Sequence, residues 1–320
     1  MPPAWGAGPD ELRAFKEFGT ETVCDQVKVD GQPTETFKNE FWTSQQREGH
    51  SLHEVSYRAC FKPSLPAFFI ERLSKPGDLV LDPFMGRGTT LLEASLRSRV
   101  PCGNDVNPLS SMLVRPRLSP PSLAAVHERI DALDLWWSGD IDPDLLVFFH
   151  PETLRALCAM RAHFIRKERD GELDAVDDWL RMVCVNRLTG HSNGFFSVYT
   201  LPPNQATSAE GQRRINEKRK QVPEQRDVGA ILKKKSKALL ADVQPLMGSQ
   251  QEHAGRAALM TGVASAMPQL ADQSVQLVVT SPPFLDVCGS DAPLSAESVK
   301  GPEGTSPAMA RASGEELPRQ

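Results

Sequence analysis

The sequence lacks several features that would narrow its class. No apolar run reaches the roughly eighteen residues that a membrane-spanning helix requires, so no membrane partner is expected. The first residues lack the basic start and apolar stretch of a secretory signal, which makes a cytoplasmic location the expectation. The six cysteines lie far apart and form no CxxC pair, so the sequence indicates neither a zinc site nor a disulfide framework, and no metal is expected.

Positive charge is in the minority overall but is concentrated in one segment. The formal net charge is −5, which argues against a surface that is basic throughout. Residues 211–237 nevertheless gather many lysines and arginines. Such a run is either a solvated helix face or a surface that binds a polyanion.

Short apolar runs alternate with helical patterns in the first half of the chain. Residues 62–74 predict a helix, and residues 79–81 predict a buried strand that ends in a glycine-containing loop, 82–90. A helix over 91–96 and a strand over 100–106 follow. This order is a βαβ unit, which predicts parallel strands joined by a right-handed crossover.

A helical pattern dominates residues 136–255, where Pro151 and Asp174 mark two helix starts. We interpret this range as an insertion into an α/β domain. The strand pattern returns weakly at 257–260 and more clearly at 275–280, which brings the predicted strands to four.

The glycine loop is the first candidate binding element, with the sequence Asp82-Pro83-Phe84-Met85-Gly86-Arg87-Gly88-Thr89-Thr90. Glycine lets a ligand approach the backbone, and the carboxyl end of a parallel strand beside a helix N-terminus is where such folds bind nucleotides. Asp105 lies seventeen positions after Gly88, near the offset at which an acidic residue binds ribose hydroxyls. The absence of lysine disfavours a P-loop, and Leu91 stands where a dinucleotide-binding loop has its third glycine. A tight turn without a ligand is the alternative.

The second candidate element is the tetrapeptide after the last predicted strand, Ser281-Pro282-Pro283-Phe284. Alone it predicts only a rigid turn. Together with the glycine loop it resembles the S-adenosylmethionine-dependent DNA amino-methyltransferases, which carry a DPFxGxGTT-like loop and an (S/T/N/D)PP(Y/F) tetrapeptide. The resemblance covers residues 41–284 and is least specific over the insertion. Families with serine first more often methylate cytosine N4, and those with aspartate or asparagine first more often methylate adenine N6.

The resemblance implies transfer of a methyl group from S-adenosyl-L-methionine to the exocyclic amino group of a base in double-stranded DNA, with cytosine N4 favoured. It also implies a restriction–modification setting, with a cognate restriction endonuclease as a partner. Methylation of adenine N6, methylation of an RNA base, and an inactive relative that only binds cofactor or DNA stay open as alternatives. No covalent enzyme intermediate is required, so no catalytic cysteine is expected.

Site roles follow from the same resemblance. The expected catalytic residues are those of the tetrapeptide, Ser281, Pro282, Pro283 and Phe284. The expected cofactor-binding residues are Phe61, Lys62, Pro63, Asp82, Pro83, Phe84, Gly86, Gly88, Thr89, Thr90, Asp105 and Asn107. From the basic run itself, and not from the resemblance, DNA phosphates are expected to contact Arg213, Arg214, Lys218, Arg219, Lys233, Lys234 and Lys235, and base contacts are expected from Arg187, His191 and Asn193.

The implied fold is α/β: a doubly wound, Rossmann-like sheet with a helical insertion, incomplete at its C-terminus because fewer strands are predicted than the fold uses. Gly262-Val263 stands where the family carries a Gly-Asp pair that contacts adenine, so that contact is absent or supplied elsewhere. Residues beyond 286 lack aromatic side chains and predict disorder, and we expect a truncated methyltransferase with a non-native tail. The predicted segments are an N-terminal arm (1–45), a cofactor-binding part (46–135), the insertion with its DNA contacts (136–255), a target-base part (256–286) and the tail (287–320).

Overall fold

The computed structural model describes residues 8–42, 49–57, 61–201, 207–243, 253 and 255–282. Its contacts divide the chain into two compact units. The first comprises Met1–His127, Asp174–Met182 and Lys235–Ser281, and the second comprises Glu128–Leu173, Val183–Lys234 and Pro282–Gln320. The segment boundaries predicted from the sequence stay a prediction, and the predicted tail lies outside the described residues.

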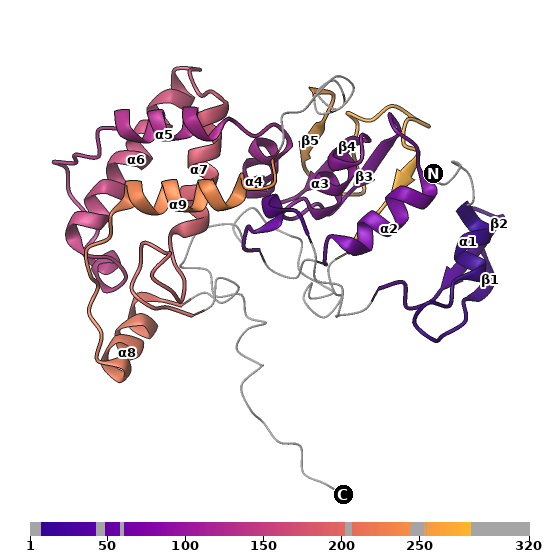
Figure 1. Cartoon of the computed structure of the whole chain (residues 1–320), viewed down its shortest axis with the longest axis horizontal. Coiled ribbons are helices and arrows are strands. Elements are labelled where there is room, and N and C mark those ends of the chain that lie inside the picture. Colours follow the sequence, from indigo (N-terminus) through magenta and orange to yellow (C-terminus); the bar gives the residue numbers. More distant parts are fainter. Residues whose placement is uncertain are drawn as a thin grey trace, which may run out of the picture. The chain divides into compact units, whose positions relative to one another are not determined.

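A parallel four-stranded sheet forms the centre of the first unit, in the order β5-β4-β3-β6 (Figure 1). The strands are β3 (Leu79–Asp82), β4 (Val100–Asp105), β5 (Ala258–Thr261) and β6 (Leu277–Val278). The chain moves outward from β3 to β4 to β5 and then returns to the other side of β3. This reversal of direction is the topology of a doubly wound sheet, so the predicted α/β, Rossmann-like class is confirmed.

Strand β3 is buried on both faces, as the apolar run at 79–81 predicts. Val80 packs with Ile70, Ala94 and Val279 on one face. Leu81 packs with Cys102 and Met260 on the other face. A central parallel strand covered on both sides needs apolar side chains at successive positions, which is why the run is continuous rather than alternating.

The helices of the first unit cover this sheet. Helix α2 (Ser64–Leu73) packs against α3 (Thr89–Leu96), and α3 packs against β3 and β4. Both helices were expected from the sequence pattern, although α3 begins two residues before the predicted range of 91–96. Helix α4 (Pro108–Leu118) contacts α3, β4 and β5, and it begins with Pro108 after the capping side chain of Asn107.

The sequence pattern predicts no element within residues 1–45, but the structure forms a short helix, α1 (Gly8–Ala14), and an antiparallel hairpin there. The hairpin joins β1 (Val23–Val29) to β2 (Gln32–Lys38) through Asp30-Gly31, whose φ angles are 48° and 79°. An Asp-Gly pair with two positive φ angles is the preferred two-residue hairpin turn. That dipeptide was the available signal for the hairpin.

The remaining helices include the two that the sequence predicts to start near Pro151 and Asp174. They are α5 (Leu123–Ala132), α6 (Pro151–Arg169), α7 (Ala175–Arg187), α8 (Ala209–Arg219) and α9 (Val228–Leu239), with short 3₁₀ turns at Ser51–His53 and Pro143–Val147. The predicted start at Pro151 is confirmed, with His150 as the capping residue. The predicted cap at Asp174 is also confirmed, because its carboxylate accepts hydrogen bonds from the Val176 and Asp177 amides at 2.9 Å each. In the described part of the chain, no helix combines the length and the apolar character that crossing a bilayer demands.

Gly88 is the residue on which the junction between β3 and α3 depends. It has a φ of +77° and caps the N-terminus of α3. A Cβ atom at this position would lie 2.4 Å from Cγ2 of Val114 on α4. The position therefore requires glycine for two separate reasons, a left-handed backbone and the close approach of a second helix.

We predict that Gly88→Ala lowers the free energy of unfolding by about 2–4 kcal/mol, the sum of left-handed strain and overpacking. Gly77→Ala is the matched control, since Gly77 has a φ of +86° but its Cβ would meet only His253 at 3.6 Å. The control should lose about 1–2 kcal/mol. Chemical denaturation measures both variants, and equal losses would show that the contact with Val114 has no consequence.

Candidate functional site

The glycine loop crosses the carboxyl end of the sheet from β3 toward β4. It leaves β3 at Asp82, whose Oδ1 accepts a hydrogen bond from the Phe84 amide at 3.1 Å. The Met85 amide then donates to the carbonyl of Asn104 in β4 at 2.9 Å. Gly86, with a φ of +49°, turns the chain back toward α3. The loop is thus held to the end of both central strands by main-chain and side-chain hydrogen bonds.

Asp105, the last residue of β4, shapes the loop from the other side. Its Oδ2 accepts a hydrogen bond from the Gly86 amide at 2.8 Å, and its Oδ1 accepts one from the Asn107 amide at 2.9 Å. Asn107 in turn accepts a hydrogen bond from the Leu109 amide at 3.0 Å and caps α4. The structure therefore brings together Gly86, Asp105 and Asn107, three residues predicted to act in one site.

The end of β6 joins the same region. The Thr280 hydroxyl donates a hydrogen bond to Asp82 Oδ1 at 2.6 Å, and the Thr90 hydroxyl donates to the Val279 carbonyl at 3.1 Å. Asp82 is 1% exposed. Its burial raises the pKa of the carboxyl group, and the charge of Asp105 acts in the same direction, while the hydrogen bond from Thr280 opposes the shift. Segments almost two hundred positions apart are thereby tied at one edge of the sheet.

Part of the predicted tetrapeptide follows at once. Ser281 and Pro282 are described, and both are exposed to solvent directly after Thr280. Pro283 and Phe284 lie outside the described residues. The structure thus brings Ser281, the first residue of the tetrapeptide, to the edge that carries the glycine loop.

Exposed apolar side chains follow the ends of three neighbouring strands of the sheet. Phe84 follows β3, Val106 follows β4 and Val263 follows β5, and they are 39%, 45% and 51% exposed. The Gly262 amide donates a hydrogen bond to the Asp105 carbonyl at 3.0 Å. Val263, the next residue, therefore starts from a backbone that is tied to the end of β4. Sequence reasoning did not single out Val106 or the exposed apolar character of Val263. Their positions just after strand ends were the available signal.

Residues 53–57 contact the loop from a segment that the sequence analysis did not single out. The Arg87 guanidinium donates hydrogen bonds to the carbonyls of His53 and Val55 at 3.0 and 2.9 Å. The ring of Tyr57 lies 3.1 Å from the point where a Cβ on Gly86 would stand. Phe61 is half-buried, Lys62 is exposed, and Pro63 is buried at the start of α2. A cofactor role for these three residues stays a prediction.

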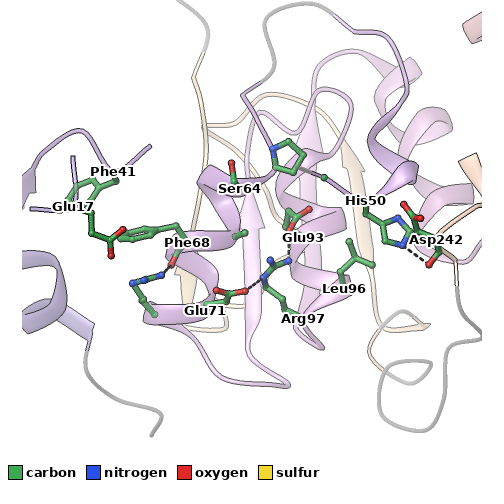
Figure 2. A pocket seen from close by; sticks show the side chains of 14 residues that line it. Glu17, Phe41, His50, Ser64, Phe68, Glu71, Glu93, Leu96, Arg97 and Asp242 are labelled. Carbon is green, nitrogen blue, oxygen red and sulfur yellow. Dashed lines mark hydrogen bonds and ion pairs between the residues drawn. The ribbon is translucent and has the colours of Figure 1, made fainter. Parts of the chain in front are cut away.

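A cavity of about 650 Å³ lies along α2 and α3 (Figure 2). Three of its charged residues are paired with one another, since Arg97 bridges Glu71 at 2.6 Å and also pairs with the buried Glu93. His50 lies opposite and makes a 3.2 Å contact with the Asp242 carbonyl. Ser64, also on the lining, accepts a hydrogen bond from the Trp42 indole at 2.6 Å. Pro63 belongs to this lining.

Glu93 also holds a buried histidine. His53 Nε2 lies 2.6 Å from Glu93 Oε1, and the two side chains are 6% and 5% exposed. Burial lowers the pKa of His53 below its ordinary value, and the charges of Arg117 and Arg87 lower it further against the opposing effect of Glu93. The imidazole is therefore neutral near pH 7 and donates its Nε2–H to Glu93.

Most of the predicted DNA-contacting residues have intramolecular partners. Ion pairs join Arg213 to Asp144, Arg214 to Glu210, Lys233 to Asp131 and Lys235 to Glu54. The guanidinium groups of Arg219 and Arg187 lie over the rings of Tyr199 and Phe195, at 3.7 and 4.1 Å. His191 also lies near the Phe195 ring, and Asn193 accepts a 3.3 Å hydrogen bond from Arg226. Lys218 and Lys234 are exposed. A role of this set in binding DNA stays a prediction.

The buried thiols are poor nucleophiles. Burial raises the pKa of Cys102 to about 11 and that of Cys184 to about 12. Since the thiolate is the reactive form, these two cysteines are inert at neutral pH. Cys288 lies outside the described residues.

Comparison with known proteins matches the part of the chain that carries the glycine loop. The family model of the N6/N4 methyltransferases, described as DNA methylase, matches residues 11–108. The type II methyltransferase M.BsoBI of Geobacillus stearothermophilus is 31% identical over 121 residues, which are 35% of this chain and 24% of that protein. The type II methyltransferase M.MjaII of Methanocaldococcus jannaschii is 33% identical over 69 residues, which are 22% of this chain and 13% of that protein.

The matched stretches thus span about a quarter or less of the relatives' length. No solved structure matches the chain. The resemblance indicated by the sequence motifs is confirmed for the matched region, which is similar to DNA amino-methyltransferases of the N4/N6 type.

The lowered pKa of His53 predicts a pH-dependent stability. An unfolded chain takes up a proton on this imidazole near its ordinary pKa of about 6.5, but the folded chain resists it. The contribution of the neutral His53 imidazole to the free energy of unfolding is therefore fully present above about pH 6.5. It is lost as the pH falls further, by at most about 1.4 kcal/mol per pH unit.

We expect His53→Gln to remove this part of the pH slope while preserving a donor to Glu93. Ser192→Asn, at an exposed position without a titratable group, is the control and should leave the slope as it is. Urea unfolding between about pH 7 and pH 5 measures the slope, within the range where histidine titrates. A His53→Gln chain with the native slope would contradict the assignment.

Proposed function

From the similarity of residues 11–108 to the N6/N4 DNA methylases, we propose that this chain binds S-adenosyl-L-methionine and transfers its methyl group to an exocyclic amino group of a DNA base. Cytosine N4 is the favoured acceptor in this proposal. The site is the carboxyl edge of the parallel sheet, at the glycine loop and the first residues of the Ser281-Pro282-Pro283-Phe284 tetrapeptide.

One observation carries the proposal above the others, namely the hydrogen bond between Thr280 and Asp82. It joins the end of β6 to the end of β3, at the point where the winding direction of the sheet reverses. Open α/β sheets bind their ligands at such a switch point, outside the carboxyl ends of the strands. A cofactor loop and a target-base segment that share this edge would bring methyl donor and acceptor together.

The residues at the end of β4 fit the nucleoside part of the cofactor. The Asp105 carboxylate is only partly buried, and it is held in place by the Gly86 and Asn107 amides. Each carboxylate oxygen keeps acceptor capacity for the ribose hydroxyls. Val106 and Val263 expose apolar surface suited to a flat adenine ring. In this proposal Val263 supplies an apolar contact where related enzymes carry an acidic residue.

The remaining predicted cofactor residues complete the proposed site. Asp82 and Thr90 are buried at the two ends of the loop, while Phe84 within the loop is exposed. The bound cofactor supplies an electrophilic methyl group on a sulfonium. Phe61, Lys62 and Pro63 stay in the proposal through the resemblance, at the methionine end.

The chemistry assigned to the tetrapeptide is alignment and hydrogen bonding. An exocyclic amine is a weak nucleophile because its lone pair is delocalised into the ring. The Ser281 hydroxyl and the Pro282 carbonyl accept hydrogen bonds from the amine, which turns the lone pair out of the ring plane. Preorganised acceptors of this kind lower the barrier without a covalent intermediate. Phe284 is proposed to stack on a base that has been flipped out of the duplex.

The partners in the proposal are double-stranded DNA and, because both relatives are named type II methyltransferases, a restriction endonuclease of the same system. The exposed Lys218 and Lys234 are the proposed phosphate contacts with the fewest competing interactions. Neutralised phosphates would make DNA affinity fall steeply with salt. Serine in the first place of the tetrapeptide supports cytosine N4 over adenine N6.

We predict that the native chain binds S-adenosylmethionine in the micromolar range and that Asp105→Asn weakens binding by about 10- to 100-fold. The substitution keeps the shape of the side chain and removes the charge that favours hydroxyl donors, and it also replaces one of the two oxygens that accept from the Gly86 and Asn107 amides with an NH2 group. Calorimetry measures the affinity, and transfer of labelled methyl groups to DNA measures the activity.

Asp272→Asn, in an exposed turn before β6, is the control and should bind as the native chain does. A native chain that neither binds the cofactor nor labels DNA would refute the proposed function. Native affinity in Asp105→Asn would refute the role of this carboxylate alone.

A further inference from the structure

Arg87 stands between the two glycines of the loop, and its side chain is directed at backbone carbonyls. Its Nη1 donates to the carbonyls of His53 and Val55, and its Nε lies 3.3 Å from the Thr89 hydroxyl. A guanidinium is planar and presents its donors in a rigid fork, whereas an ammonium group is a compact point charge on a flexible stem. Arg87 therefore links the loop to residues 53–55 through a group whose orientation is fixed by its plane.

A second arginine completes the link from α4. Arg117 is 1% exposed, and its Nε donates to the Leu113 carbonyl of its own helix at 2.7 Å. Its Nη1 donates to the Leu52 carbonyl at 3.1 Å, and its Nη2 donates to the carbonyl of Arg87. The same side chain thus holds both the loop and the segment 52–57. We call Arg87 and Arg117 the arginine clamp.

The clamped segment is fixed at two further points. The His53 side chain is bonded to Glu93 on α3. Tyr57 places its ring against Gly86, and its hydroxyl lies 3.5 Å from that of Ser110 on α4. Residues 52–57 therefore form one wall beside Gly86, which is held to the loop by hydrogen bonds to its carbonyls in addition to the burial of Leu52 and Val55.

We propose that Arg87 and Arg117 are positioning residues that hold residues 52–57 against the glycine loop, so that the cofactor meets a preformed wall. This inference rests on the proposed function for its ligand, whereas the clamp itself can be measured without one. A preformed site avoids the ordering cost that a mobile segment would add to binding. Loss of the clamp therefore weakens cofactor binding even though neither arginine needs to touch the cofactor.

The first test measures hydrogen–deuterium exchange in the full chain without ligand. Arg87→Ala should speed exchange of the amides in 52–57 and leave those of β3 and β4 protected, since local opening follows from the loss of local bonds. Arg115→Ala is the matched control, because it removes an exposed guanidinium from the same helix that carries Arg117. Unchanged exchange in Arg87→Ala would overturn the clamp.

The second test measures affinity for S-adenosylmethionine and its rescue. Arg87→Ala should bind at least about tenfold more weakly, since hydrogen bonds from charged groups are the stronger ones. Guanidine at concentrations too low to unfold the chain should restore part of this affinity, while sodium chloride of equal ionic strength should not. Arg87→Lys, which retains the charge and guards against a folding failure, should bind between the native and alanine chains.

The outcomes separate the two proposals. If the native chain binds the cofactor and Arg87→Ala binds equally well, the positioning role is wrong and the proposed function stands. If the native chain does not bind the cofactor while Arg87→Ala still loosens residues 52–57, the proposed function is wrong and the clamp stands. Weakened binding without any rescue by guanidine would also contradict the specific role of the guanidinium.

Discussion

The parallel pairing of β6 with β3 is the constraint on which the rest of the site depends. Val80 and Leu81 pair with Leu277 and Val278, and the ladder ends in the hydrogen bond from Thr280 to Asp82. Without this pairing, the glycine loop and the segment after β6 would have no common edge. Asp82 is buried, so loss of the hydrogen bond from Thr280 would be costly. The carboxyl group would stay removed from water, and the hydrogen bond that offsets its desolvation would be gone.

Charge is distributed around the loop in a complementary way. Asp82 and Asp105 lie at the ends of the two central strands, and Arg87 and Arg117 lie on the side of residues 52–57. The carboxylates accept from backbone amides, and the guanidiniums donate to backbone carbonyls. Polar side chains thus satisfy the main-chain groups that a tight turn leaves without partners in a helix or a strand. The shape of the loop follows from these bonds as much as from its glycines.

Local patterns predicted the elements nearest the site. The apolar run at 79–81, the glycine loop and Asp105 identify β3, the turn and the end of β4, because each of these depends on neighbours within about one βαβ unit. The starts of α6 and α7 were readable from Pro151 and Asp174 for the same reason.

Long-range contacts were beyond the reach of such patterns. Whether β6 lies beside β3 or beyond β5 is decided by packing between segments far apart in the chain, and the contacts of Arg87 depend on where residues 53–55 lie. The basic residues of 213–235 illustrate a further limit, since charge density in a sequence does not reveal that Asp144 and Asp131 lie close enough to pair with Arg213 and Lys233. The Asp30-Gly31 dipeptide is a local signal, and it predicts the hairpin turn without any long-range contact.

The central claim is that this sheet edge supports methylation of an exocyclic amino group in DNA. The most direct measurement is to incubate duplex DNA with the purified chain and S-adenosylmethionine carrying a labelled methyl group, digest the DNA to nucleosides and identify the labelled one. The account predicts labelled N4-methylcytosine, and it predicts that Ser281→Ala lowers its yield by about 100-fold, as expected for the loss of a preorganised hydrogen-bonding group. Label found only in N6-methyladenine would contradict the favoured base, and the absence of any labelled nucleoside would contradict the claim itself.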